Sequence, residues 1–168
     1  MSTLLVPDSH LQGPPAVRHR TKSRRLRASD PAVRAMTDFF RDPPLTITAD
    51  RALDTAMDDM FRFGVRAFLV VRELTVVGLI TVEDLRQARR TNATRVGEVM
   101  TEASDMPVID WLTLRECTVR DLLEIFEGAD VQHMVVLETE STRRHTVRGL
   151  VHRTRIDRGL LGAGAAPD

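Results

Sequence analysis

The chain contains the same pattern twice, and this repeat constrains its fold more than any single motif does. A Met-Thr pair occurs at Met36-Thr37 and again at Met100-Thr101. Each pair is followed, in the same order, by an apolar strand that a proline precedes, an amphipathic helix, a β-branched hairpin and a basic helix. Because one copy alone leaves an apolar face open, we expect the two copies to bury that face against each other.

Apolar residues at helical spacing predict one amphipathic helix in each copy. In the first copy they are Leu53, Ala56, Met57, Met60 and Phe61. Asp50 stands where an N-cap is expected and Gly64 where a C-terminal glycine is expected. In the second copy the same stripe consists of Val119, Leu122, Leu123 and Phe126. There, Gly128 is expected to end the helix and Cys117 to lie in its first turn.

Short, valine-rich runs predict buried strands, because turn residues flank them. They cover residues 67–71 and 76–80 in the first copy, and residues 133–137 and 147–151 in the second. We expect a tight turn near Glu73 between the first two, and a longer polar loop from Glu138 to His145 between the others. Each copy is thus predicted as β-α-β-β-α, and the fold class as α/β (α+β), with two repeats packed as one pseudo-two-fold module.

A length of 168 residues suits one such module with flanking segments. We expect a basic, proline-containing extension at residues 1–31, the first repeat at 32–92, the second at 93–158 and a flexible tail at 159–168. The dense basic run from Arg18 to Arg27 has no interleaved aromatic residues for base stacking. A solvated segment that packs on the module is therefore favoured over a nucleic-acid-binding segment.

The composition limits the compartment and the partners. Lys and Arg number 24, as do Asp and Glu, so no overall charge attracts the chain to nucleic acid or to an acidic membrane. A single cysteine excludes an intramolecular disulfide and suggests a reducing compartment. The apolar run Leu4-Leu5-Val6 is too short for a signal peptide, and no run approaches the ~18 residues that cross a bilayer. We expect a cytoplasmic protein without a membrane segment.

Residues 78–84, with the sequence Gly-Leu-Ile-Thr-Val-Glu-Asp, carry the sharpest local chemistry. A helix that begins at Thr81 would offer free N–H groups and a hydroxyl to a phosphate. Asp84 could accept hydrogen bonds from two vicinal ribose hydroxyls, and Gly78 would let the backbone approach a ligand or a neighbouring strand. Thr-x-x-Asp at a helix start is also an ordinary capping box. From the residues alone, capping is favoured.

The repeated order Met-Thr, Pro, amphipathic helix, Val-Val, Gly-Leu-Ile-Thr-x-x-Asp resembles the cystathionine-β-synthase (CBS) domain family. It looks like a tandem pair, a Bateman module, over about residues 32–158, in a stand-alone CBS protein. The resemblance implies a regulatory, non-catalytic binder of AMP, ADP or ATP, or of S-adenosylmethionine, without an obligatory cofactor. It also implies a homodimer.

The resemblance further implies which residues bind the nucleotide. Thr81 would contact the phosphate, Asp84 would contact the ribose, and Gly78 belongs to the same motif. The adenine would lie between the first strand and the hairpin, in contact with Ile47, Thr48, Arg66, Ala67 and Phe68.

The second copy departs from this pattern. In register with Gly149, His152 takes the place of the threonine and Arg155 that of the aspartate. Arg155 opposes the helix dipole and cannot accept from a ribose. Arg153, Arg155 and Arg158 could hold a polyphosphate tail, but a half kept for packing and dimerisation is favoured. The resemblance therefore supports one nucleotide site at most.

Other chemistry finds no support in the sequence. The histidines have no metal-ligand spacing with one another or with Cys117, and no Walker loop, nucleophile elbow or catalytic Ser/Cys–His arrangement occurs. We expect no catalytic residue and no metal. Trp111 stands at an insertion in the second copy, where it would fill the second site or anchor a partner.

Three functions are compatible with these patterns. The favoured one is adenine-nucleotide binding in the first repeat, with the ligand biasing two packings of the halves or of a dimer. The second is a ligand-free module for dimerisation and protein interaction that regulates a partner enzyme or transporter. The third is nucleic-acid binding through the segment from Arg18 to Arg27.

Overall fold

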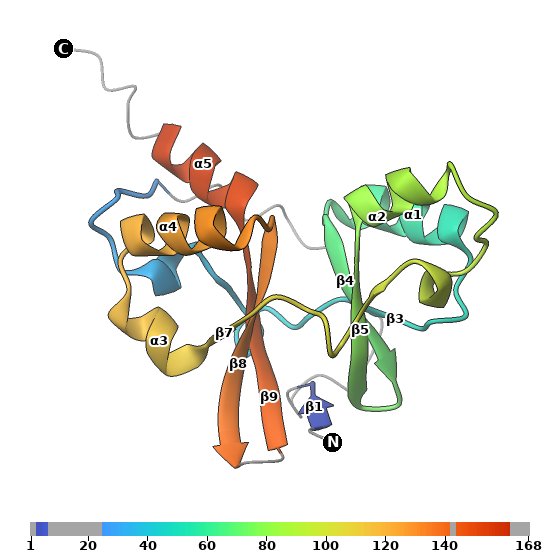
Figure 1. Ribbon diagram of the computed structural model, residues 1–168, viewed down its shortest axis with the longest axis horizontal. Helices are drawn as coiled ribbons and strands as arrows, with labels where there is room; N and C mark the ends of the chain where they lie inside the picture. The colour runs from blue at the N-terminus through green and yellow to red at the C-terminus, as the bar shows by residue number, and fades with distance from the viewer. Residues whose placement is uncertain (1–2, 7–24, 142–143, 162–168) are drawn as a thin grey trace.

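The computed structural model describes residues 3–6, 25–141 and 144–161, and it contains two similar halves side by side (Figure 1). The first half consists of β3 (Thr46–Ile47), α1 (Leu53–Phe63), β4 (Ala67–Arg72), β5 (Thr75–Thr81) and α2 (Val82–Ala88). The second consists of β7 (Val108–Asp110), α3 (Trp111–Glu116), α4 (Val119–Ala129), β8 (His133–Ser141), β9 (Arg144–His152) and α5 (Arg153–Leu161). This confirms the mixed α/β class and the two repeats. Short elements outside this plan are β1 (Thr3–Leu5), η2 (Ala32–Ala35), β2 (Thr37–Asp38), η3 (Val96–Glu98) and β6 (Thr101–Glu102).

The two hairpins have equivalent registers. Val70 pairs with Gly78 in β4–β5, and Val136 pairs with Gly149 in β8–β9. A short parallel strand flanks each hairpin, with Ile47 opposite Val70 and Ile109 opposite Val136. One sheet with the order β3-β4-β5-β1-β9-β8-β7 therefore runs through both halves.

The two Met-Thr segments cross between the halves. β2 precedes the first half in the chain but pairs with β9 of the second, and β6 precedes the second half but pairs with β5 of the first. Met36 covers Gly149, and Met100 covers Gly78. A methyl group at Gly78 would lie 2.6 Å from the carbonyl oxygen of Thr101 and 2.8 Å from Sδ of Met100. Both glycines are thus required by the close approach of another strand.

Apolar side chains form three clusters that follow this crossing. One lies under α4 and α5 and includes Leu26, Ala32, Ala35 and Met36 from the segment before the first half. A second lies under α1 and α2 and includes Val96 from the segment between the halves. The third joins both halves, with Leu4, Phe39, Leu69, Val76, Leu79, Met106, Val135 and Val147 buried in it. Each half therefore completes its core with a segment that leads into the other half, and the third cluster packs the two halves against each other.

The expected helix ends are partly wrong. Gly64 does end α1 in the left-handed conformation, with φ 65°. The N-cap of α1 is Ala52, not Asp50, because Asp50 instead bonds to the Thr48 side chain and the carbonyl of Thr94 accepts from the Leu53 N–H. α4 continues past Gly128 to Ala129, and Asp130, with φ 51°, closes it.

Three further expectations are wrong. β8 and β9 continue through the segment predicted as a polar loop, because Glu138 pairs with Thr146 and Thr139 with His145. Phe61 is 71% exposed, since α1 buries only the neighbouring face with Ala56, Met57 and Met60. Cys117 ends α3 and precedes the N-cap Thr118, so it lies outside α4. Burial raises the pKa of its thiol, with Asp121 and Glu116 adding to the effect.

The expected basic extension falls largely outside the described residues, since residues 7–24 are not among them. Its described parts belong to the module: β1 is a strand of the sheet, and Leu26 is 2% exposed and donates its N–H to the carbonyl of Gly159. α5 extends to Leu161, and residues 162–168 lie outside the description. In the described ranges, no helix has the length and apolar content needed to cross a bilayer.

The crossing generates a stability prediction. We expect Gly78→Ala to lower the free energy of unfolding by about 1–3 kcal/mol, because the added methyl overpacks against the Thr101 backbone. Gly128→Ala is the matched control: its Cβ meets nothing within 4 Å, and alanine in a helix gains about 0.5–1 kcal/mol. Urea unfolding of the wild type and both variants measures the two changes. Equal stability of Gly78→Ala and the wild type would contradict the close approach.

Candidate functional site

Thr81 and Asp84 meet at the junction of β5 and α2, where the sequence predicts the site. Asp84 Oδ2 accepts hydrogen bonds from the Thr81 N–H (2.8 Å) and hydroxyl (2.7 Å), and the Thr81 hydroxyl oxygen accepts from the Asp84 N–H (3.2 Å). This is a complete capping box, the interpretation that the residues alone favour. Within the described residues, Oδ1 of Asp84 accepts no hydrogen bond, so one carboxylate oxygen remains available.

The same box occurs at the start of α4. Asp121 Oδ2 accepts from the Thr118 N–H (2.8 Å) and hydroxyl (2.7 Å), and the Thr118 hydroxyl oxygen accepts from the Asp121 N–H (3.3 Å). The geometry of the box therefore identifies a helix cap and by itself does not indicate a ligand. What distinguishes Thr81 is its place: it is 9% exposed and ends a central strand.

The residues expected around the adenine separate into two groups. Ala67 lies opposite Thr81, and the carbonyl of Arg66 accepts from the Val82 N–H, so both adjoin the box. Ile47 (8% exposed) and Phe68 (3%) are buried under α1 and α2. Thr48 is exposed and bonds to Asp50, and Gly78 lies under β6. The structure thus brings Arg66, Ala67, Thr81 and Asp84 together.

A pair of histidines occupies the equivalent position in the second half. His133 lies opposite His152, as Ala67 lies opposite Thr81, and the two imidazole rings meet edge to face with centroids 4.1 Å apart. His152 ends β9 immediately before α5, and its Nδ1 accepts a hydrogen bond from the Thr154 N–H at 3.0 Å. The Nε2 of His133 is buried and has no partner among the described residues. The sequence pattern placed His152 correctly but gave no sign that the rings touch.

Both imidazoles resist protonation. Burial lowers the pKa of His133 to about 4, and the charge of Arg66 lowers it further. Burial likewise lowers the pKa of His152 to about 3, with His133, Arg66 and Arg158 adding to the effect. Arg66 belongs to the first half, so this electrostatic effect crosses between the halves. At neutral pH, the arginines carry the positive charge here and the histidines are neutral.

Two arginines of α5 form contacts with other parts of the protein. Arg153 forms an ion pair with Glu127 at 3.1 Å. Arg155 donates to the Thr37 hydroxyl at 2.5 Å, and burial lowers its pKa while nearby Asp42 opposes the shift. Arg155, in the place of the ribose-binding aspartate, therefore holds the crossing segment β2. The interpretation of the second copy as a half kept for packing and dimerisation stays a prediction.

Trp111 belongs to a cluster that the sequence did not reveal. The Arg148 guanidinium lies 4.2 Å from the centroid of the Phe40 ring and 4.6 Å from that of the Trp111 ring. It also forms ion pairs with Asp38 (3.3 Å) and Glu138 (3.1 Å). These residues come from distant parts of the chain, and no local pattern links them. These cation–π contacts and ion pairs hold the segment that follows β2 against the second half.

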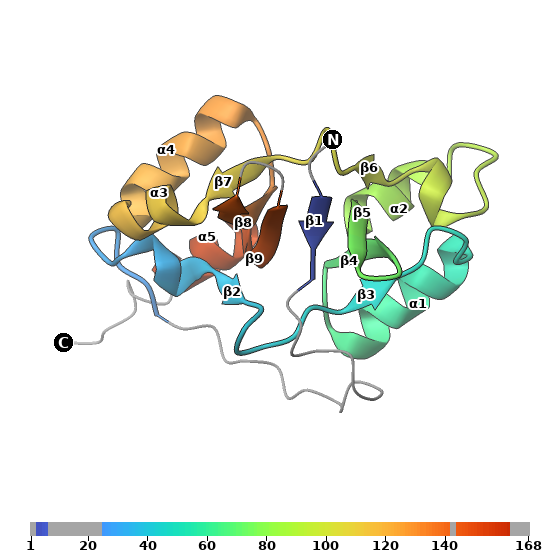
Figure 2. The same ribbon diagram turned by 90° about the horizontal axis from the view of Figure 1, so that it is seen from below.

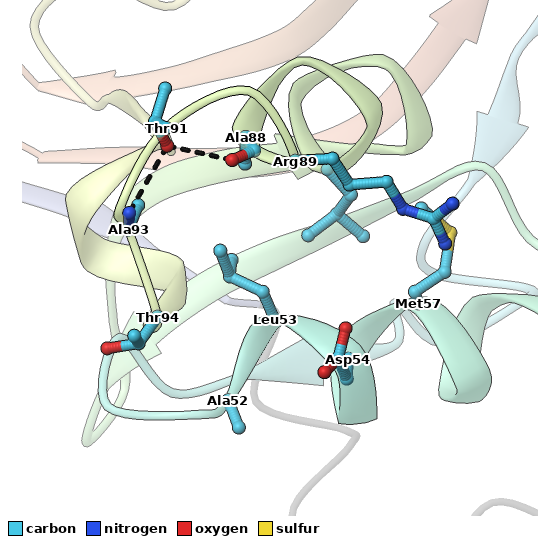
Figure 3. Close-up of a pocket in the computed structure, with 10 residues that line it drawn as sticks. Ala52, Leu53, Asp54, Met57, Ala88, Arg89, Thr91, Ala93 and Thr94 are labelled. Carbon is cyan, nitrogen blue, oxygen red and sulfur yellow. Dashed lines mark hydrogen bonds between the residues drawn. The ribbon is translucent and has the colours of Figure 1, made fainter.

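A separate cavity of about 320 Å³ lies between the start of α1 and the end of α2 (Figure 3). Leu53 and Met57 of α1 and Leu85 of α2 line it, with the charged side chains of Asp54 and Arg89. It contains none of the residues expected to bind the nucleotide. No group of three or more His, Cys, Asp or Glu side chains suited to a metal occurs in the part of the chain that the structure describes.

Comparison with known proteins identifies the family. Residues 35–91 match the family model described as CBS domain. The crystal structure of the CBS domain pair of protein MJ0100, in complex with 5′-methylthioadenosine and S-adenosyl-L-methionine, has a TM-score of 0.55, with 19% identity over 76% of this chain and 96% of that one. Residues 35–91 therefore match a CBS domain, and the described residues have the fold of a CBS domain pair. This confirms the resemblance found in its sequence.

Two further proteins are similar to this chain. The crystal structure of CBSX2 in complex with AMP has a TM-score of 0.55, with 16% identity over 80% of this chain and 98% of that one. The choline transport ATP-binding protein OpuBA of Bacillus subtilis (strain 168) is 35% identical over 104 residues. That alignment covers 61% of this chain but only 26% of OpuBA. At these identities the two solved structures establish the fold alone.

The histidine pair generates a pH prediction. Both folded pKa values lie below the unfolded value of 6.5, so the stability that the neutral pair contributes is complete above pH 6.5 and is lost as the pH falls toward 4. We expect the His133→Gln/His152→Asn variant to lose less stability than the wild type between pH 7 and 5, by at least about 1 kcal/mol. Urea unfolding at both pH values measures this difference, with His145→Asn as the control. Parallel pH profiles of the wild type and the double variant would contradict the burial of neutral imidazoles.

Proposed function

We propose that this CBS domain pair is a non-catalytic regulatory module that binds an adenine nucleotide beside Thr81 and Asp84 of the first half. The observation that carries the proposal is that Asp84 and Arg66 lie at the same end of the hairpin, and that Oδ1 of Asp84 accepts no hydrogen bond from the described residues. A carboxylate accepts from ribose hydroxyls and a guanidinium donates to phosphate, so the two groups together suit a nucleotide.

The same arrangement favours the first half over the second. The second half has Arg155 in place of the aspartate, and this side chain is already bonded to Thr37. The neutral His133–His152 pair adjoins Arg66 and presents the unpartnered Nε2 of His133. A phosphate near Arg66 would therefore meet both halves, and a ligand that binds one packing of the halves better than another shifts their equilibrium.

The nucleotide site is tested by thermal unfolding with AMP, ADP, ATP or S-adenosylmethionine. A ligand at about 100 times its dissociation constant adds about 2.7 kcal/mol of stability. We expect one of the adenine nucleotides to raise the melting temperature of the wild type, and Asp84→Asn to abolish that rise.

Asp121→Asn is the matched control, because it weakens an identical capping box away from the proposed site. Both variants should lose comparable stability without ligand, and only Asp121→Asn should keep the ligand-induced rise. A rise that survives Asp84→Asn would place the ligand elsewhere, and no rise with any of the four compounds would refute the nucleotide site.

We also propose that the module forms a homodimer that regulates a partner enzyme or transporter. Phe61 on α1 is 71% exposed and faces away from the core of its own half, so a second copy could cover it. A role with a transporter is consistent with the sequence similarity to OpuBA.

Sedimentation velocity tests the dimer. We expect the wild type to sediment as a dimer and Phe61→Ser to shift the equilibrium toward monomer at least tenfold. Leu112→Ser, at a 63% exposed position on α3, is the control and should leave the dimer intact. A monomeric wild type, or a dimer indifferent to Phe61→Ser, would refute this interface.

A further inference from the structure

β1 lies between the two hairpins at the ends that carry their turns. Leu5 pairs antiparallel with Thr75 of β5, while Thr3–Leu5 run parallel to Arg144–Thr146 of β9. The N–H of Val6 donates to the carbonyl of Leu74 at 3.2 Å. Figure 2 shows the strand standing between the two halves. Among the described elements, β1 alone pairs with both hairpins.

One side chain anchors this strand. Leu4 is 8% exposed and belongs to the apolar cluster shared by both halves, whereas Thr3 is exposed and Leu5 is half-buried. The other residues of this cluster belong to other strands and their connections. Most of the cluster can therefore stay packed when β1 is released. A three-residue strand with one buried anchor can open without global unfolding, because local opening costs less than the whole fold.

The opposite ends of the hairpins carry the proposed nucleotide site. Ala67 pairs with Thr81 there in the first half, and His133 pairs with His152 in the second. β1 joins the turn ends, and Figure 1 shows it well below the ends that bear α2 and α5. Each hairpin is one hydrogen-bonded unit, so a change in spacing at its turn end changes the position of its other end.

We propose that the gap between β5 and β9 is a binding site for a short, extended apolar strand, which residues 3–6 fill reversibly, and that its occupancy is coupled to nucleotide binding between the halves. Main-chain pairing to two strand edges gives the site its affinity, and the pocket for Leu4 gives it its selectivity. The coupling rests on the proposed function, whereas the strand site does not.

Hydrogen exchange tests the strand site in the full-length chain. We expect Leu4→Asp to release β1, so that segments 74–76 and 144–147 exchange at least tenfold faster than in the wild type. Thr3→Asp is the matched control, because it places the same charge one residue away at an exposed position. If Leu4→Asp fails to fold, Leu4→Ser is measured in the same way. Unchanged exchange in a folded Leu4 variant would overturn the proposal.

Addition of the missing strand in trans tests the site directly. A synthetic peptide with the sequence of residues 1–8 should restore the protection of both segments in Leu4→Asp, and the same peptide carrying Leu4→Asp should not. Failure of the wild-type peptide to restore protection at millimolar concentration, or equal restoration by both peptides, would overturn the strand site.

The coupling is measured as AMP affinity by calorimetry. We expect Leu4→Asp to weaken AMP binding at least fivefold and Thr3→Asp to leave it within twofold of the wild type. Equal affinity in Leu4→Asp and the wild type would overturn the coupling while leaving the strand site intact. If AMP does not bind the wild type, the same titrations are made with ADP, ATP and S-adenosylmethionine. If none of the four binds, the coupling fails with the proposed nucleotide site, and the peptide result still decides the strand site.

Discussion

The structure depends on the crossed packing of two Met-Thr segments on two glycines. Each segment precedes one half in the chain and pairs with the hairpin of the other, so Met36 lies on Gly149 and Met100 lies on Gly78. A Cβ at either glycine would collide with the backbone or the methionine above it. Because the chain passes from one half to the other at both segments, neither half contains all the residues of its own core. The repeat is thus a single interlocked unit with two similar faces.

This crossed packing determines which charged groups lie near the candidate site. Burial lowers the pKa of His133 and His152 in the second half, and the charge of Arg66 in the first half lowers both further. Arg155 of the second half holds Thr37 of the first crossing segment. The charge of Arg66 therefore links the two halves electrostatically at the hairpin ends where Thr81 and Asp84 lie. The nucleotide that we propose at this site would contact both halves, and a ligand that binds one packing of the halves better than another shifts their equilibrium.

Much of the fold could be predicted from the sequence because periodicity reports burial directly. The valine-rich runs and the helical stripe of the second copy lie where the pattern indicates. Periodicity does not show which strands pair with each other, however. The crossing of β2 and β6 therefore could not be predicted, although the sequence shows both Met-Thr pairs and both glycines. β1 has only three residues, too few to show a period.

The site was predictable in part for a similar reason. The Thr81–Asp84 pair follows from a local motif, and the structure contains its hydrogen bonds. Apolar residues such as Ile47 and Phe68 give no sign of which face of a strand they occupy, and the structure buries both under helices. The Phe40–Arg148–Trp111 stack joins three separate segments and leaves no local signal.

The interlocked unit is tested most directly by comparing two probes of urea unfolding in the wild type. Trp111, the only tryptophan in the chain, reports on the second half through its fluorescence, and far-UV circular dichroism reports on both halves. The crossed segments predict one transition, with the same midpoint and slope for both probes, because neither half can unfold without removing part of the core of the other. Separate midpoints, with circular dichroism changing while the fluorescence of Trp111 stays native, would show that the first half unfolds independently and would contradict this account.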